Sequence, residues 1–96
     1  MDVGTVIKQD DCRDRSQVYR LGTASPCDRS AIRRLGSLGE LDYYADFPRP
    51  FYRLRGRAFW LKGVEGECEA ELILLTDSAD AAGAQLTQAL EQLGAI

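Results

Sequence analysis

The stretch that decides the fold is FYRLRGRAFWLKG, residues 51–63, which continues through VEG into ECEAELILLT, residues 67–76. Side chains alternate in character from Phe51 to Lys62, which predicts a single β-strand. The preceding Pro48 and Pro50 exclude regular structure there, because proline lacks a ladder donor and restricts its neighbour. The GVEG segment predicts a turn in which Gly66 takes a left-handed conformation. Residues 67–76 then return as an antiparallel strand.

Strict alternation would give the two faces of this hairpin different chemistry. Tyr52, Leu54 and Trp60 would share one face with Gly56 and Ala58. The opposite face would hold Phe51, Arg53, Arg55, Arg57, Phe59 and Leu61. On the return strand Glu67, Glu69 and Glu71 alternate outward with Ile73 and Leu75, so we expect the arginine face to lie beside the glutamate face. The acids would then neutralise the arginines.

Working outward toward the N-terminus, two short β-branched or alternating segments at residues 3–8 and 16–21 predict a hairpin. Ser25-Pro26-Cys27-Asp28 predicts the start of a helix with Ser25 as its cap, and Gly36 predicts its end. Leu38–Tyr44 reads equally as a strand or an irregular connector.

Toward the C-terminus, apolar residues recur at helical spacing from Asp77 to Leu93. Asp77 and Ser78 are candidate caps, and Gly94 is the expected end. Gly83 lies inside this helix and predicts close packing against a neighbour. The apolar positions are Ala79, Ala82, Leu86, Leu90 and Leu93.

The order of elements is therefore β-β-α-(β)-β-β-α, with the strand at residues 38–44 left open. Two helices with apolar stripes can bury them on one face of a mostly antiparallel sheet. The predicted fold class is α+β, a two-layer sandwich, and a ferredoxin-like arrangement is one version of it. At 96 residues the chain predicts a single domain, 1–96.

Composition sets limits on the class of protein. An apolar fraction of 45% with 28% charged residues is typical of a globular domain. No run of the sequence approaches the roughly 18 apolar residues of a membrane span, so we expect no membrane partner and a cytoplasmic location. All twelve Lys and Arg precede Gly63, whereas seven of the fifteen acids lie from Gly63 onward. Such asymmetry favours attraction between the halves or toward partners.

Residues 55–62 partly resemble the strand motif of single-strand RNA-recognition domains, in which a cation and aromatic rings contact phosphate and bases. Arg55, Gly56, Ala58 and Phe59 match that motif. Arg57 and Lys62 stand where stacking aromatics are expected, and the glutamates of the return strand would repel a phosphate backbone. Binding of single-stranded nucleic acid through residues 53–62 is therefore an alternative hypothesis.

The cysteines predict little metal chemistry. Cys12, Cys27 and Cys68 are widely spaced, and the chain has no histidine. Because these spacings match no zinc or iron–sulfur pattern, we expect no metal and no cofactor. Cys27 is the best redox candidate, since a thiolate in the first turn of a helix is stabilised by free N–H groups. Cys68 is expected on the apolar face of its strand. A cysteine-based redox or metal role at Cys27 is a second alternative.

Protein binding is the function class that the sequence favours. The chain lacks a glycine-rich phosphate loop and a catalytic histidine, which argues against an enzyme. Most of its aromatics lie between Tyr43 and Trp60, interleaved with arginines, and interface centres are enriched in both. We expect a non-catalytic regulatory or binding module whose partner is another protein or a second copy. The predicted contact residues are Phe47, Arg53, Arg55, Arg57, Phe59 and Leu61.

Overall fold

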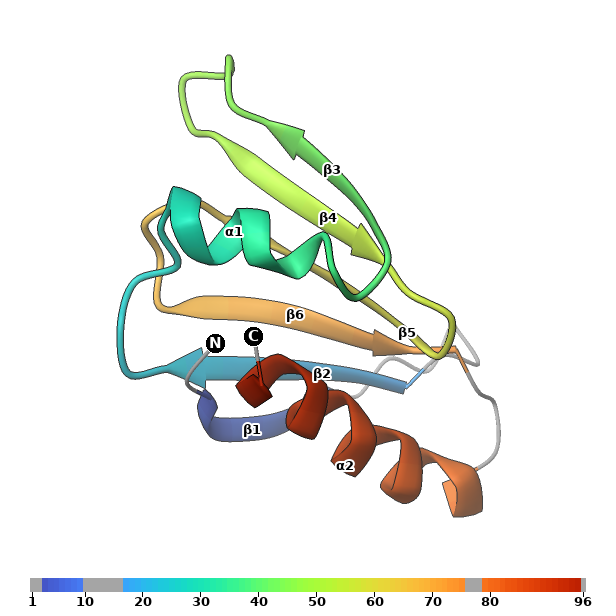
Figure 1. The fold of residues 1–96 in the computed structure, drawn as a ribbon. Helices are drawn as coiled ribbons and strands as arrows, with labels where there is room; N and C mark the ends of the chain where they lie inside the picture. The colour runs from blue at the N-terminus through green and yellow to red at the C-terminus, as the bar shows by residue number, and fades with distance from the viewer. Residues whose placement is uncertain (1–2, 10–16, 76–78, 96) are drawn as a thin grey trace.

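The computed structural model describes residues 3–9, 17–75 and 79–95. Within them the chain forms an antiparallel six-stranded sheet and two helices (Figure 1). The elements are β1 (Val3–Gln9), β2 (Gln17–Thr23), α1 (Arg29–Leu35), β3 (Glu40–Tyr44), β4 (Phe51–Arg55), β5 (Phe59–Val64), β6 (Glu69–Leu74) and α2 (Ala79–Ala95). The Cα radius of gyration, 12.7 Å, is close to the roughly 13 Å of a compact chain of about 100 residues. The predicted α+β class is confirmed.

The strand order is β1-β2-β6-β5-β4-β3. The N-terminal hairpin is confirmed as β1 paired with β2, and residues 40–44 form the edge strand β3. Helix α1 connects β2 to β3, which lies at the far edge of the sheet, and four consecutive strands separate the helices. A ferredoxin-like arrangement is not confirmed, because that motif places β-α-β and β-α-β units in succession.

The expected single strand over residues 51–62 is wrong, because the chain turns back at residues 56–58. β4 and β5 are two antiparallel strands in which Leu54 faces Leu61 and Arg55 faces Trp60. Gly56 donates its N–H to the carbonyl oxygen of Phe59 at 2.9 Å, and a Cβ at Gly56 would come equally close to that oxygen. A side chain does not fit there without movement, so glycine favours this tight turn.

The three-residue turn reverses the alternation after it. Phe59 and Leu61 therefore join Tyr52 and Leu54 on the inner face of the sheet, which faces the helices, and Trp60 lies on the outer face. Phe59 is 3% exposed and Leu61 0%, whereas Trp60 is 37% exposed. The expectation that Phe59 and Leu61 lie on the outer face is thus wrong.

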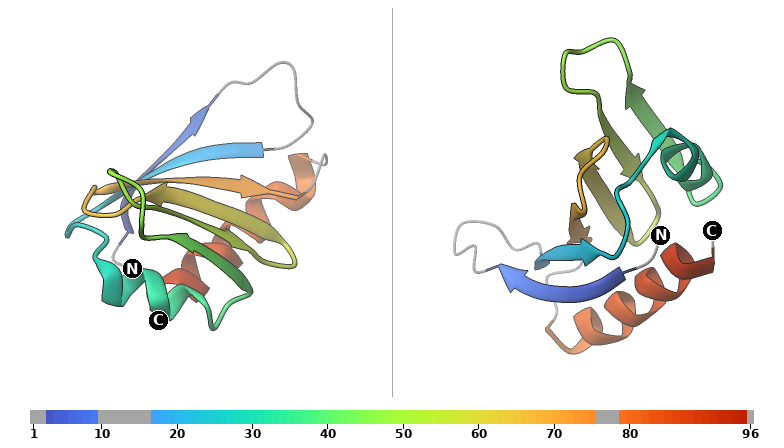
Figure 2. Two further views of the ribbon diagram at one scale, coloured as in Figure 1. Left: turned by 90° about the horizontal axis from the view of Figure 1, so that it is seen from above. Right: turned by 90° about the vertical axis from the view of Figure 1, so that its left-hand side faces the viewer.

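One core joins the inner face of the sheet to both helices. Ile32 and Leu35 of α1 and Ala82, Ala89 and Leu93 of α2 belong to the same buried cluster as the inner-face residues. Figures 1 and 2 show both helices on the same side of the curved sheet, with α1 toward β3 and β4 and α2 toward β1 and β2. Neither of the two described helices covers the outer face of the sheet.

The helices begin and end differently from the prediction. Asp28, not Ser25, caps α1, because its Oδ1 accepts the N–H of Ala31 at 2.8 Å. α2 continues through Gly94 to Ala95, and its candidate caps lie outside the described residues. A Cβ built on Gly83 would meet nothing within 4 Å, so the expected close packing at Gly83 is wrong.

At the β5–β6 connection the predicted left-handed glycine is confirmed, since Gly66 has φ +87°. β6 begins later than expected, at Glu69. Cys68 consequently precedes the strand and is exposed instead of packing on its apolar face.

Candidate interaction surface

The outer face is built from residues that the strand register places side by side. One cross-strand row runs Val18–Ile73–Trp60–Arg55, since each is directly opposite the next. Val18 is buried, Ile73 half-buried and Trp60 exposed. We call Val18, Ile73 and Trp60 the apolar row. It gives the helix-free face an uncharged centre flanked by charged residues.

A second row, two residues along each strand, consists of charged residues of both signs. Arg20, Glu71, Lys62, Arg53 and Asp42 follow one another across β2, β6, β5, β4 and β3. Lys62 Nζ lies 3.5 Å from Glu71 Oε2, and Arg53 Nη2 lies 3.1 Å from Asp42 Oδ2. These pairs are partly exposed, so each contributes at most about 1 kcal/mol to folding. Their main effect is to satisfy most charges of this row within the chain.

The sequence predicted that the arginines of β4 would pair with the glutamates of β6, but they pair with other acids. Arg55 Nη2 lies 3.2 Å from both Glu40 Oε1 and Asp42 Oδ2 on the edge strand β3. The reason is the turn at residues 56–58, which inserts β5 between β4 and β6. The acids that neutralise Arg53 and Arg55 thus come from β3. The nucleic-acid hypothesis remains a prediction, but it gains nothing from arginines that are already paired.

The predicted contact residues separate in the structure. Arg53 and Arg55 are partly exposed on the outer face, and Arg57 is exposed in the β4–β5 turn. Phe59 and Leu61 lie in the core, away from this surface. The sequence did not predict Trp60 as a surface residue. A turn at Gly56-Arg57-Ala58, had it been recognised, would have placed Trp60 on the outer face.

Phe47 lies in the connection between β3 and β4. It is 51% exposed and packs with Tyr44 and Phe51 in an aromatic cluster, with ring centroids 6.0 Å and 5.2 Å away, respectively. Tyr44 and Phe51 are stacked, with centroids 4.6 Å apart. Such ring contacts contribute roughly 0.5–1.5 kcal/mol each beyond burial, so they hold Phe47 against Tyr44 of β3 and Phe51 of β4.

The environment of Cys27 differs from the predicted one. Cys27 precedes the cap of α1 and is 4% exposed, with its backbone hydrogen-bonded to Gly66 and Glu67. Burial raises the pKa of the Cys27 thiol, an interaction with the Tyr52 hydroxyl lowers it, and the Asp28 charge raises it further. The net pKa shift is upward, which opposes formation of a thiolate. The sequence argument placed Cys27 in the first turn of a helix, where free N–H groups would stabilise a thiolate. In the structure Cys27 lies before the helix cap, so this argument does not apply. Cys12 lies outside the described residues.

In the part of the chain that the structure describes, no group of three or more His, Cys, Asp or Glu side chains is arranged to hold a metal ion. Neither described helix has the length and apolarity needed to cross a membrane. Comparison with known proteins finds no family model, no curated protein and no solved structure that matches the chain.

Proposed function

We propose that the protein is a non-catalytic binding module that associates with a second copy of itself through the outer face of its sheet. The observation that carries the proposal is Trp60, which keeps 37% of its surface exposed on a face that neither described helix covers. Tryptophan is enriched among the residues that dominate binding energy. In a two-fold dimer the same patch is used by both copies, so Trp60 and Ile73 would be buried twice.

The size of the face predicts a weak dimer. Strands about 4.8 Å apart, with about five residues each at 3.3 Å, give a six-stranded face of roughly 500 Å². Two such faces bury roughly 1,000 Å², which is the lower limit for a specific interface. The paired charges around the apolar row must be accommodated as well. We therefore expect association that depends on protein concentration.

Arg53, Arg55 and Phe47 would surround the contact. The arginines are held by Asp42 and Glu40, so a partner copy meets fixed ion pairs instead of free charges. Pre-formed pairs lose little side-chain entropy on binding. An odd number of cysteines fits a reducing compartment, and we place the module in the cytoplasm on that ground.

Sedimentation velocity over a wide concentration range tests this function. We expect the wild type to shift toward a dimer as concentration rises and Trp60→Asp to remain a monomer, because two carboxylates would face each other at the contact. Gln88→Asp is the matched control: it adds the same charge at an exposed position on α2, on the helix side of the molecule. Circular dichroism checks that both variants are folded.

A wild type that stays monomeric at every concentration would end the self-association proposal. Equal weakening by Trp60→Asp and Gln88→Asp would show that the contact is not on the outer face.

A further inference from the structure

Strand β1 leaves one side of its backbone without a partner among the described strands. It ends the strand order at the edge opposite β3 (Figure 1). Residues 4–8 are all exposed, and they include Val6 at 38% and Ile7 at 60%. An exposed sheet edge presents unpaired N–H and C=O groups, to which a further strand can bond.

The register shows which residues of β1 use their backbone groups inside the sheet. Thr23 at the end of β2 donates its N–H to the Cys68 carbonyl oxygen at 2.8 Å, on the β6 side. Because the bonding direction alternates along an antiparallel strand, the even-numbered residues of β2 bond toward β1. Ile7 is opposite Arg20, so its N–H and C=O are used within the sheet.

Val6 and Lys8, the neighbours of Ile7, therefore direct their N–H and C=O groups away from the sheet. These groups fit the backbone of an extended chain, which repeats donors and acceptors at the same two-residue spacing. The register of β1 shifts between Val3 and Thr5 and is regular from Thr5 onward. A further strand can thus pair in register over residues 5–9.

The exposed side chains of this edge are apolar on both faces of the sheet. Ile7 lies on the outer face, because it is opposite Arg20. Val6 lies on the inner face, because it is opposite the buried Leu21. Side chains of a paired strand lie directly beside those of its neighbour. An added strand with apolar residues opposite Val6 and Ile7 would bury both.

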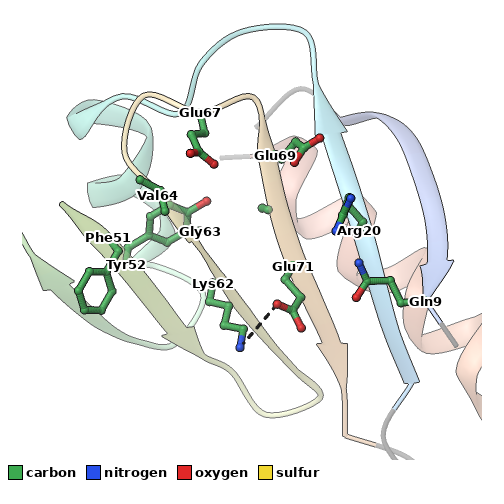
Figure 3. A pocket seen from close by; sticks show the side chains of 11 residues that line it. Gln9, Arg20, Phe51, Tyr52, Lys62, Gly63, Val64, Glu67, Glu69 and Glu71 are labelled. Carbon is green, nitrogen blue, oxygen red and sulfur yellow. Dashed lines mark ion pairs between the residues drawn. The ribbon is translucent and has the colours of Figure 1, made fainter. Parts of the chain in front are cut away.

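The charge beside this edge is positive and lacks counter-ions among the described residues. Lys8 is exposed and has no ion pair there. With the Gln9 amide oxygen turned toward Arg20, Nε and Nη2 of the guanidinium each donate to it at 3.1 Å, but the amide is neutral. Figure 3 shows Glu71, the acid opposite Arg20, directed toward Lys62 instead. An acidic strand would neutralise this edge, whereas a second copy of β1 would add further cations.

The other edge strand, β3, does not offer the same surface. Its acids Glu40 and Asp42 would repel an acidic strand, and they already pair with arginines of β4. Leu41 and Tyr43 pack against the core, and Figure 2 shows α1 close to this edge. Strand addition is therefore favoured at β1.

We propose that β1 binds an extended acidic segment of another protein, which pairs with it as an additional antiparallel strand. The segment places an acidic residue opposite Lys8 and apolar residues opposite Ile7 and Val6. Main-chain hydrogen bonds supply affinity in this mode of recognition, and the side chains supply selectivity. The contact uses the edge of the sheet, so it does not depend on the outer face proposed for self-association.

NMR titration of the full chain tests this site with the capped peptide acetyl-Thr-Thr-Glu-Val-Val-Thr-Thr-amide. In the antiparallel register its glutamate is opposite Lys8, its first valine opposite Ile7 and its second valine opposite Val6. We expect saturable shifts along β1 and a dissociation constant at or below about 1 mM. Amide hydrogen exchange should slow at least about tenfold at Val6 and Lys8, and less at Ile7, whose N–H is already bonded.

Peptide variants separate backbone pairing from charge attraction. N-methylation of the glutamate and of the second valine removes the two N–H groups directed at β1, so binding should be lost. N-methylation of the first valine is the matched control, because that N–H points away from β1 and binding should persist. The analogue with lysine in place of glutamate should bind at least about tenfold more weakly.

Protein variants test the role of Lys8. Lys8→Glu should reverse the preference between the glutamate and lysine peptides. Arg33→Glu makes the same change in net charge at an exposed position on α1, and it should leave the preference unchanged. Trp60→Asp should bind the peptide as the wild type does, so failure of the self-association proposal would not affect this result.

Four outcomes would overturn the proposal. The first is the absence of saturable shifts at about 10 mM peptide, ten times a millimolar dissociation constant. The second is equal binding of the two N-methylated peptides, which would exclude strand pairing. The third is equal binding of the lysine analogue, which would exclude an acidic segment. The fourth is slowed exchange at Val6 and Lys8 without peptide, increasing with protein concentration, which would identify a second copy as the occupant.

Discussion

The sharpest test of the fold compares two adjacent residues, Phe59 and Trp60. Phe59 is 3% exposed inside the core, so Phe59→Ala removes a complete ring and leaves a cavity. Core Phe→Ala substitutions destabilise by about 3–5 kcal/mol. Trp60 is 37% exposed on the outer face, where solvent fills the space left by a smaller side chain. For Trp60→Ala we expect about 1–2 kcal/mol from the loss of its buried part.

Urea unfolding followed by far-UV circular dichroism gives both numbers from the transition midpoint and slope. A chain of 96 residues has a total stability of about 5–15 kcal/mol, so Phe59→Ala removes a large fraction of it. Phe59→Leu keeps the comparison measurable if Phe59→Ala is unfolded, since a swap of similar volume costs less than about 1.5 kcal/mol. The slope should stay constant across the series.

A larger loss for Trp60→Ala than for Phe59→Ala would refute this assignment. That result would place Trp60 with Tyr52 and Leu54 in the core, as an uninterrupted strand requires. The turn at residues 56–58, and with it the β4–β5 hairpin, would then be wrong.

Three further outcomes follow from the packing. Gly63→Ala should destabilise by about 1–3 kcal/mol, because its Cβ would lie 2.5 Å from the Tyr52 hydroxyl oxygen. Gly83→Ala should stabilise the fold by up to about 1 kcal/mol, because a Cβ there meets nothing within 4 Å and alanine favours a helix. Thermal unfolding compares the two variants, and equal effects would contradict the packing. Exposed Cys68 should react rapidly with a thiol reagent and buried Cys27 only as the protein opens, so equal rates in the native state would contradict the burial of Cys27. Because burial raises the pKa of Cys27 from its ordinary 9.0, the unfolded chain releases that proton first; stability in urea should fall as pH rises above about 9, and less so in Cys27→Ala.

Local patterns were sufficient for the parts of the fold that depend on neighbouring residues. The hairpin of β1 and β2 follows from short β-branched segments, and α2 follows from apolar residues at helical spacing. Gly66 was predicted in the left-handed region because a tight connection between two strands requires it.

The candidate site was predicted less well, and the reason is a single turn. A run such as Arg53–Trp60 fits one long strand or two short ones, since both satisfy alternation locally. What distinguishes them is whether Leu54 and Leu61 meet across a hairpin, which is a contact between strands. Because of the three-residue turn, Trp60 lies on the outer face where Phe59 was expected. The turn also inserts β5 between β4 and β6, so the arginines pair with the acids of β3 instead of the glutamates of β6.

The sequence by itself determined the α+β class, the helix-forming and strand-forming segments and the concentration of arginines and aromatics between residues 43 and 60. Those properties depend on composition and short-range periodicity. Only the tertiary structure decided the strand order, the exposure of Trp60 and the pairing of Arg53 and Arg55 with the acids of β3. The physical reason is that β-sheet pairing joins residues far apart in the chain, so register and partner choice depend on how all strands bury their apolar faces together.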